Sequence, residues 1–247
     1  MRILTLNLHT WQEPDQPRKF RDVATALLDL RIDVACFQEV GELFANGRPC
    51  PDTNASRILL SLLPSSWHSF ADWTHIGFSA YREGLAILTP HPILASDSAW
   101  ISASTDPHDI HARAAIRARV GFPALGPLDV VCTHLSWPSA GFRDQFSRLR
   151  DWLGAPSTPP PPLGTLVAGD FNLPAPSPDF DELPSLWPYR EQFSLVSPPD
   201  PDAPRIDHFW LSSSSPFRPS APAILFDPAS SARVSDHPAY VLSFNLP

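Results

Sequence analysis

The chain has 247 residues, of which 43% are hydrophobic and 11% aromatic, and its formal net charge is -8. This composition can fill a large core, whereas no apolar run approaches the roughly 20 residues needed to span a bilayer. The acidic balance argues against a broad electrostatic grip on DNA or RNA, which needs many Lys and Arg side chains against phosphates.

Apolar periodicity divides the chain into strands and helices. In chain order, the pattern predicts a strand over 2–8, a helix over 18–30, a strand over 33–38, a helix over 52–63, strands over 85–88, 93–101, 114–122 and 128–133, a helix over 142–153, and strands over 166–171, 206–211 and 239–244. For the second helix, Asp52, Thr53 or Asn54 is available as the N-cap. A proline-rich connector over 156–162 and an irregular stretch over 176–205 lie between the later elements.

The order of these elements indicates the fold class. Helices alternate with many strands, and some strands follow each other closely enough to be antiparallel. This pattern favours an α/β (α+β) protein in which two sheets pack on each other with helices outside, rather than one doubly wound sheet. Because no boundary or close repeat is evident, we expect one domain over residues 1–247.

Cysteine usage and the N-terminus bear on the cellular location. The three cysteines are too few for a disulfide framework, and Cys36 and Cys132 lie in apolar, strand-like runs. A strand pattern begins at Arg2, without the charged and apolar regions of a secretion signal. Both features favour a reducing, cytoplasmic setting.

The most informative stretch is the apolar run from Leu166 that ends in Gly-Asp-Phe-Asn. Asp170 and Asn172 are two residues apart, so they leave an extended strand on the same side, while Phe171 points into the core. Pro174 is expected to close the segment. A common Gly-Asp turn explains these letters equally well when they are taken alone.

Polar residues also follow other apolar strands, namely Asn7, Glu39, His134, Asp207, Asp236 and His237. Each has a structural explanation by itself, such as a turn residue or a satisfied core histidine. As a set they predict a site, because carboxylates and amides beside buried backbone must be paired or hold a metal. Hard oxygen ligands without nearby cysteine favour Mg²⁺ or Mn²⁺ over zinc, and the loop-like context of His108 and His111 argues against a zinc pair.

Six of these segments resemble motifs of the endonuclease/exonuclease/phosphatase (deoxyribonuclease I-like) superfamily and occur in its order. They are Thr5-Leu6-Asn7, Phe37-Gln38-Glu39-Val40, Thr133-His134-Leu135, Gly169-Asp170-Phe171-Asn172, Ile206-Asp207-His208 and Ser235-Asp236-His237. The resemblance implies a four-layer α/β/β/α sandwich of two facing mixed sheets flanked by helices. It also implies metal-dependent hydrolysis of a phosphate ester.

The resemblance further implies a role for each matching residue. Glu39, Asn7 and Asp236 would hold the metal, while Asp170, helped by Asn172, would orient and deprotonate the attacking water. His134 and His237 would donate to the phosphoryl oxygens, with Asp207 orienting His237. Glu83 is a candidate partner of His134, although a strand-edge charge explains it as well.

Several segments look like the bacterial phosphatases that act on maltose 6'-phosphate, notably Leu6 to Glu13, Thr74 to Phe78, Tyr81 to Leu88 and His134 to Trp137. That resemblance implies an aromatic wall for a sugar and a cationic grip on the phosphate. The candidate residues are Trp11, Trp73 and Trp137 for the wall, and His75 with Arg113 or Arg117 for the grip. Core packing is the alternative for each tryptophan.

The sequence therefore predicts a cytoplasmic, Mg²⁺-dependent phosphatase acting on a small phosphorylated sugar or similar phosphomonoester. The first rival is a nuclease or other phosphodiesterase on the same scaffold, against which the acidity counts. The second is a catalytically dead binding module, against which the intact polar set counts. The oligomeric state and the substrate are left open.

Overall fold

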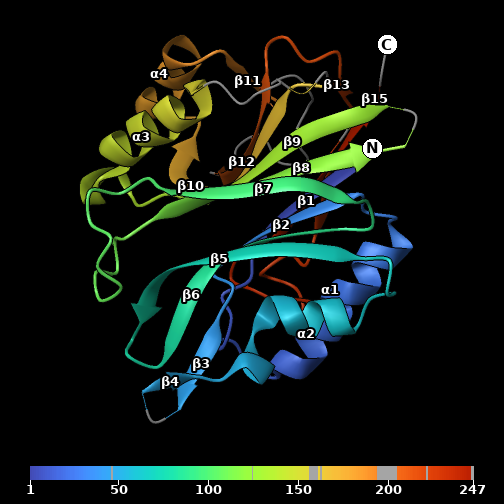
Figure 1. Ribbon diagram of the computed structural model, residues 1–247, viewed down its shortest axis with the longest axis vertical. Coiled ribbons are helices and arrows are strands. Elements are labelled where there is room, and N and C mark those ends of the chain that lie inside the picture. The colour runs from blue at the N-terminus through green and yellow to red at the C-terminus, as the bar shows by residue number, and fades with distance from the viewer. Residues whose placement is uncertain are drawn as a thin grey trace.

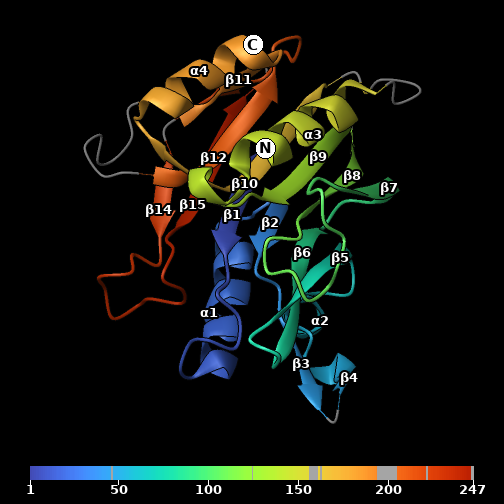
Figure 2. The same ribbon diagram turned by 90° about the vertical axis from the view of Figure 1, so that its left-hand side faces the viewer.

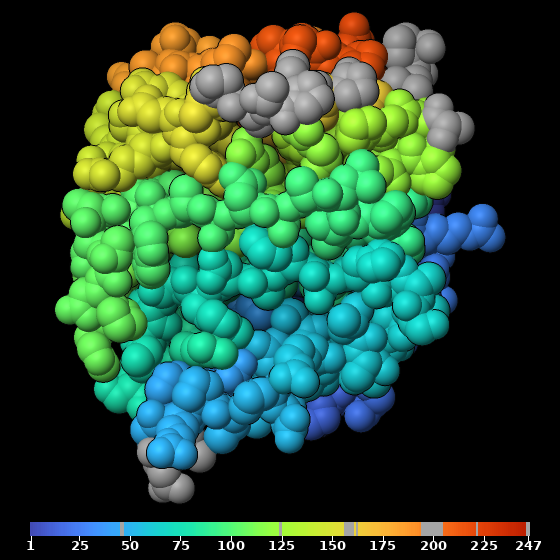
Figure 3. Space-filling view, viewed as in Figure 1, coloured from blue at the N-terminus to red at the C-terminus, as the bar shows by residue number. Residues whose placement is uncertain are grey.

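The structure is a computed structural model that describes residues 1–45, 47–123, 125–155, 161, 163–193, 205–220 and 222–245. Most of the predicted connector over 156–162 and part of the stretch over 176–205 lie outside these residues. Within them, two sheets face each other and helices cover their outer faces (Figure 1). In the space-filling view of the same side, cyan side chains of one sheet meet green side chains of the other across the middle (Figure 3).

The first sheet contains β1 (Arg2–Asn7), β2 (Val34–Gln38), β3 (Glu42–Ala45), β4 (Arg48–Pro49), β5 (His68–Gly77), β6 (Tyr81–Thr89), β13 (Arg218–Pro219), β14 (Ala223–Leu225) and β15 (Ala239–Asn245). Its order is β13-β15-β1-β2-β6-β3-β4, with β14 also on β15 and β5 also on β6. β1 and β2 are parallel, whereas β15 and β6 pair antiparallel on either side of them.

The second sheet contains β7 (Ile93–Trp100), β8 (Ala114–Phe122), β9 (Gly126–His134), β10 (Thr165–Ala175), β11 (Tyr189–Glu191) and β12 (Arg205–Ser212). Its order is β11-β12-β10-β9-β8-β7, and β9 and β10 are parallel while β10 and β12 are antiparallel. Each sheet is therefore mixed, with one parallel pair near its centre.

The helices lie on the outer faces of the two sheets, as Figure 2 shows from the side. α1 (Gln16–Asp29) and α2 (Ala55–Ser61) cover the first sheet, and α3 (Phe142–Gly154) and α4 (Pro178–Leu186) cover the second. Short 3-10 turns precede α2 and α3, at Pro51–Thr53 and Pro138–Ala140. No helix among the described residues has the length and apolar character needed to cross a bilayer.

Three apolar layers hold these four layers of secondary structure together. Between the sheets, Cys36 and Ile87 pack with Val130 and Leu166. A second layer lies between α1, α2 and the first sheet, and a third between α3, α4 and the second sheet. α1 contributes through side chains at helical spacing, which are Phe20, Val23, Ala24 and Leu27. The predicted four-layer sandwich is confirmed.

Several predicted elements differ in detail from the observed ones. The helix over 52–63 is divided by Asn54, whose side chain accepts a hydrogen bond from the Arg57 amide and caps α2. β10 continues through Pro174 instead of ending there. α4 and β11 fall in the stretch expected to be irregular, since Ser177 caps α4 and a proline at its first turn is compatible with a helix.

The packing of the two parallel pairs brings the predicted site residues together. β1 and β2 pack against β10 and β9. Asn7 is the last residue of β1, Glu39 follows β2, and His134 is the last residue of β9, directly opposite Asp170 in β10. The ends of β1, β2 and β9 therefore meet the middle of β10 at one edge of the molecule.

Candidate active site

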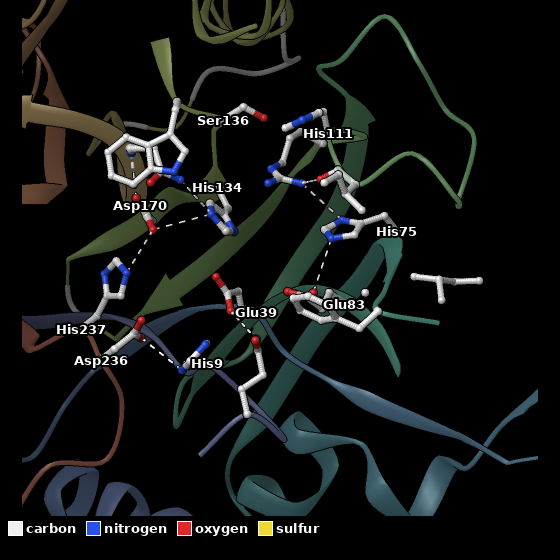
Figure 4. A pocket seen from close by; sticks show the side chains of 18 of the residues that line it. His9, Glu39, His75, Glu83, His111, His134, Ser136, Asp170, Asp236 and His237 are labelled. Carbon is white, nitrogen blue, oxygen red and sulfur yellow. Dashed lines mark hydrogen bonds and ion pairs between the residues drawn. The ribbon is translucent and has the colours of Figure 1, made fainter. Parts of the chain in front are cut away.

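A pocket of about 700 Å³ opens at this edge. The strand ends form its floor, and three segments form its rim: the β5–β6 turn, the loop between β7 and β8, and the loop after β9 (Figure 4). The residues that line it are His9, Gln12, Glu39, His75, Ile76, Gly77, Phe78, Ser79, Glu83, His108, Ile110, His111, Arg113, His134, Ser136, Trp137, Asp170, Asn172, Asp236 and His237.

Asp170 lies at the centre of the floor and is 1% exposed. Asp170 Oδ1 accepts a hydrogen bond from the Asn172 backbone amide at 2.7 Å, and Oδ2 accepts one from Asn7 Nδ2 at 3.2 Å. Burial and the nearby charge of Asp207 raise the pKa of Asp170 to about 7. A carboxylate with this pKa is suited to take a proton near neutral pH.

The backbone around Asp170 explains how a buried strand can deliver this side chain. Gly169 has a φ of 150°, and a Cβ on it would lie 2.0 Å from the Thr133 carbonyl oxygen. Only glycine therefore allows β10 to approach β9 this closely. Asn172 has a left-handed φ of 49°, and its backbone amide donates to Asp170.

Two histidines flank Asp170 from different elements (Figure 4). His134 Nε2 lies 3.6 Å from Asp170 Oδ2, and His237 Nε2 lies 3.7 Å from the same oxygen. Burial and the charge of Arg113 hold the pKa of His134 well below its usual value. His134 is therefore neutral, and Asn172 Nδ2, 3.1 Å away, can donate to its Nε2.

His237 has the opposite character because Asp207 stands behind it. Its Nδ1 lies 2.9 Å from Asp207 Oδ2. Burial lowers the pKa of His237, but this hydrogen bond and the surrounding carboxylates outweigh burial and raise the pKa to about 10. The site thus pairs one neutral histidine with one protonated histidine on either side of Asp170.

Glu39 faces Asp170 from the first sheet. Asn7 Nδ2 donates to its Oε1 at 2.9 Å, so the same amide group bridges Glu39 and Asp170. Gln12 Nε2 donates to the other oxygen at 3.3 Å. Burial and the charge of Glu83 raise the pKa of Glu39. For both Glu39 and Asp170, burial and a neighbouring carboxylate therefore disfavour the charged form.

This crowding is the test of whether a divalent cation fits the site. Glu39, Glu83, Asp170 and Asp236 all line the pocket, while Arg113 is the only Lys or Arg among its lining residues in the described part of the chain. A cation next to these oxygen donors would relieve the repulsion between them. The donor set fits Mg²⁺ or Mn²⁺. The candidate ligands are the carboxylates of Glu39 and Asp236 and the side-chain oxygen Oδ1 of Asn7.

Two groups of side chains have metal-ligand spacing within the described residues. One contains Asp170, Asp207 and His237, and the other contains His9, Glu13 and Asp236. In the second group, Glu13 already binds two cationic groups, Lys19 Nζ at 2.5 Å and Arg233 Nη2 at 2.5 Å. Glu13 therefore pairs with cationic side chains of the protein, and we do not assign it to the metal.

Arg113 brings a buried positive charge to the pocket. Its Nη1 donates to the Ile110 carbonyl at 2.6 Å and lies 3.3 Å from His75 Nδ1. No carboxylate of the described residues lies within ion-pair distance of Arg113, and its Nε has no hydrogen-bond partner among them. A guanidinium held this way, 9% exposed, is suited to bind an anion.

Glu83 lies at a different place from the one predicted. Its Oε1 is 3.5 Å from His75 Nε2, so it partners His75 rather than His134. The reason is its position on β6, directly opposite His75 in the β5–β6 hairpin. Both side chains line the pocket.

Three predicted substrate-binding residues lie outside the residues that line the pocket. Arg117 makes two hydrogen bonds to Asp97, at 2.8 and 2.6 Å, on the neighbouring strand. Trp73 stacks with the Arg82 guanidinium, 4.1 Å from the ring centroid. Trp11 packs edge-on against Phe20 of α1. Of the three tryptophans proposed for an aromatic wall, the structure therefore places Trp137 alone at the pocket.

The structure also brings residues to the pocket that no prediction assigned to it. They are His9, Gln12, Ile76, Gly77, Phe78, Ser79, His108, Ile110, His111 and Ser136. His9 and Gln12 follow β1 within five residues of Asn7, which is a usable signal. The others lie at the end of β5 or in loops and turns, and their position relative to the floor depends on the packing of the two sheets.

Comparison with known proteins adds to this geometry. The sequence model of the "Endonuclease/Exonuclease/phosphatase family" matches residues 5–237. No sequence in a search of curated proteins matches the chain. Among solved structures, an endonuclease/exonuclease/phosphatase family protein from Leptotrichia buccalis C-1013-b superposes with a TM-score of 0.83 at 20% identity, covering 100% of both chains.

Two further solved structures carry more specific names. The mannosyl-6-phosphatase of Bacteroides thetaiotaomicron VPI-5482 has a TM-score of 0.70 at 14% identity, with 100% of both chains covered. TDP2 of D. rerio, complexed with single strand DNA product, has a TM-score of 0.70 at 17% identity, covering 99% of this chain and 98% of that one. At these identities the likeness establishes a shared fold.

Proposed function

Because this chain belongs to the endonuclease/exonuclease/phosphatase family, whose members are divalent-metal-dependent hydrolases of phosphate esters, we propose that it is a Mg²⁺-dependent phosphatase. Its substrate in this proposal is a small phosphorylated sugar or similar phosphomonoester. The observation that carries the proposal is the position of Asp170 between a neutral His134 and a protonated His237, opposite Glu39 of the facing sheet.

In this proposal Asp170, His237 and Arg113 have separate tasks, and the N–H of neutral His134 is a second donor to the phosphoryl oxygens. Asp170 orients the attacking water and takes its proton, which its pKa of about 7 permits. His237 donates to a phosphoryl oxygen from Nε2, while Asp207 holds its other nitrogen at 2.9 Å and stabilises its charge. Arg113 binds the phosphoryl oxygens as the buried cation of the pocket.

Glu39, Asn7 and Asp236 would hold the metal ion. A bound Mg²⁺ supplies charge neutralisation at the phosphoryl group and stabilisation of the leaving oxygen. The protein contributes positioning, because Asn7 hydrogen-bonds to both Glu39 and Asp170 and so fixes the two carboxylates relative to each other.

The preference for a monoester rests on charge. A polynucleotide extends beyond one phosphate and requires cationic side chains along its path. The chain carries a net charge of -8, and Arg113 is the only Lys or Arg among the described residues that line the pocket. Action on nucleic acid is the competing proposal, supported by the shared fold with TDP2 of D. rerio.

The experiment that tests the function is a release assay with purified protein and Mg²⁺. We expect inorganic phosphate from hexose 6-phosphates and no nicking of plasmid DNA or cleavage of single-stranded oligonucleotides. Chelation with EDTA should abolish the release, and Glu39→Gln should weaken Mg²⁺ binding in calorimetry, whereas Glu182→Gln on exposed α4 should not. Cleavage of DNA without phosphate release would overturn the proposal, and so would full activity after chelation.

We place this activity in the cytoplasm and expect a small phosphorylated molecule as its partner. Cysteine usage supports this location, since the described cysteines are all unpaired and two of them, Cys36 and Cys132, are buried. Fractionation of cells that express a tagged full-length chain would test the location. Recovery of the protein outside the cytoplasm would contradict it.

A further inference from the structure

Three exposed apolar side chains form part of the pocket rim. Phe78 is 80% exposed, Ile110 56% and Trp137 50%, and all three line the pocket. Single exposed hydrophobic residues are ordinary on protein surfaces, whereas these three come from separate segments and line the same cavity. We call Phe78, Ile110 and Trp137 the apolar rim.

Phe78 occupies a backbone conformation that side chains disfavour. It and Ser79 form the two central positions of the β5–β6 turn, with φ values of 48° and 56°, and the Ala80 amide donates to the Gly77 carbonyl at 2.9 Å. A turn with two left-handed residues usually takes Asn or Gly. Strain of this kind clusters at functional sites, and here it presents an aromatic ring at the pocket.

Buried polar side chains hydrogen-bond to the backbone of the segments that carry Ile110 and Trp137. Arg113 donates to the Ile110 carbonyl at 2.6 Å. Gln145 of α3, which is buried, accepts from the Ser136 amide at 2.8 Å and donates to the His111 carbonyl at 3.3 Å. One side chain thus ties the loop before β8 to the loop after β9. The apolar rim is therefore preorganised, which lowers the entropic cost of binding.

We propose that the apolar rim binds an uncharged ring in the alcohol part of the substrate, so that the enzyme selects ring-bearing phosphomonoesters over small acyclic ones. This inference rests on the proposed function. Arg113, the cation of the pocket, is buried, whereas each of the three apolar side chains of the rim is at least half exposed. A pyranose C–H face and an aromatic ring share the chemistry that such a surface recognises.

The test compares three primary alkyl phosphates whose alcohols have similar leaving ability: ethyl phosphate, benzyl phosphate and a hexopyranose 6-phosphate. With the full chain and Mg²⁺, we expect kcat/KM to be at least tenfold higher for one ring-bearing ester than for ethyl phosphate. Whether benzyl phosphate or the hexopyranose 6-phosphate has the higher kcat/KM shows whether the rim prefers an aromatic ring or a sugar. Phe78→Ala, Ile110→Ala and Trp137→Ala should each lower this ratio severalfold, while Leu94→Ala, 58% exposed on β7 and outside the pocket lining, should keep it.

A binding measurement separates this inference from the proposed function. Benzylphosphonate and ethylphosphonate resist hydrolysis, so calorimetry reports their affinities whether or not the protein turns over. We expect tighter binding of benzylphosphonate, or of a hexose phosphonate, than of ethylphosphonate, with the difference reduced in Phe78→Ala and Trp137→Ala. Equal ratios in wild type and variants overturn the inference. Absence of phosphate release from all three esters overturns the proposed function instead.

Discussion

The floor and the rim of the pocket are built in different ways. The floor consists of strand-end residues from both sheets, and Asn7 crosses from the first sheet to Asp170 of the second. The rim consists of loop and turn residues, and Phe78, the most exposed of its apolar side chains, is 80% exposed. The difference suggests a division of labour in which buried, fixed groups perform the chemistry and exposed groups choose the substrate.

The largest effect is expected at the centre of the floor. Asp170→Asn keeps the shape of the side chain and removes its ability to take a proton. We expect kcat to fall about 10³-fold to 10⁴-fold, as for loss of a general base. The measurement is steady-state phosphate release, with circular dichroism to show that the fold is kept.

Asp181→Asn on α4 is the matched control, since this aspartate is exposed and lies outside the residues that line the pocket. It should change kcat by less than about twofold, as for most surface substitutions. Normal turnover by a folded Asp170→Asn protein would show that the floor does not supply the base.

The next effect concerns the protonation of His237. Its folded-state pKa of about 10 lies above the ordinary value of 6.5, so His237 stays protonated and able to donate until the pH rises through about 10. Asp207→Asn removes the charge that raises this pKa. The alkaline limb of kcat/KM should then move to lower pH, and at pH 9 the variant should be slower by about 10²-fold. Identical pH profiles for the two proteins would contradict the assigned donor.

A third prediction tests the charge cluster of Glu13, Lys19 and Arg233, which lies outside the pocket lining. Burial raises the pKa of Glu13, but hydrogen bonds from Lys19, Arg233 and His9 outweigh it and lower the pKa to about 2, below the ordinary value of 4.5. The stabilisation is therefore complete above pH 4.5 and is lost as the pH falls toward 2. A pKa shift of this size corresponds to about 3 kcal/mol, and solvent screening reduces the expected stabilisation to about 2 kcal/mol.

The measurement is denaturant unfolding of wild type and Glu13→Gln between pH 2.5 and 7. The free energy of unfolding of the wild type should fall toward that of Glu13→Gln as the pH falls through this window. Between pH 5.5 and 7 Glu13 stays ionised, so its contribution to the difference should be constant. Glu182→Gln, which removes an exposed carboxylate on α4, should show no such loss. An advantage independent of pH would mean that Glu13 acts through packing alone.

The floor was predictable from sequence, whereas Trp137 was the only residue of the apolar rim that the sequence assigned to the site. Asn7, Glu39 and His134 end or follow an apolar strand, and Asp170 follows the apolar run at the start of β10, so the packing of the two parallel pairs brings them together. Phe78 has no such signal, because its place depends on a turn conformation that its sequence does not favour. The wall expected from Trp11 and Trp73 is wrong for a different reason, because the sequence does not distinguish a tryptophan that packs on other side chains from one that lines a pocket.

For the fold, apolar periodicity located some elements and missed others whose formation depends on tertiary contacts. Long apolar runs such as β8 were located to the residue, and α1 followed from its buried face. β5 was missed because its side chains alternate weakly, with most of them partly exposed. α4 was missed because prolines at 178 and 184 outweigh its capping serine in a local pattern.

The smallest effect should appear where the rim is supported. Gln145→Leu keeps the volume of the side chain and removes its hydrogen bonds to the Ser136 amide and the His111 carbonyl. Each such bond contributes about 1 kcal/mol, so the preference for a ring-bearing ester over ethyl phosphate should fall about fivefold. Arg148→Leu on the exposed face of α3 is the control. If Gln145→Leu instead reduced kcat on every ester equally, the loops would serve the floor, and the two regions would not be separable.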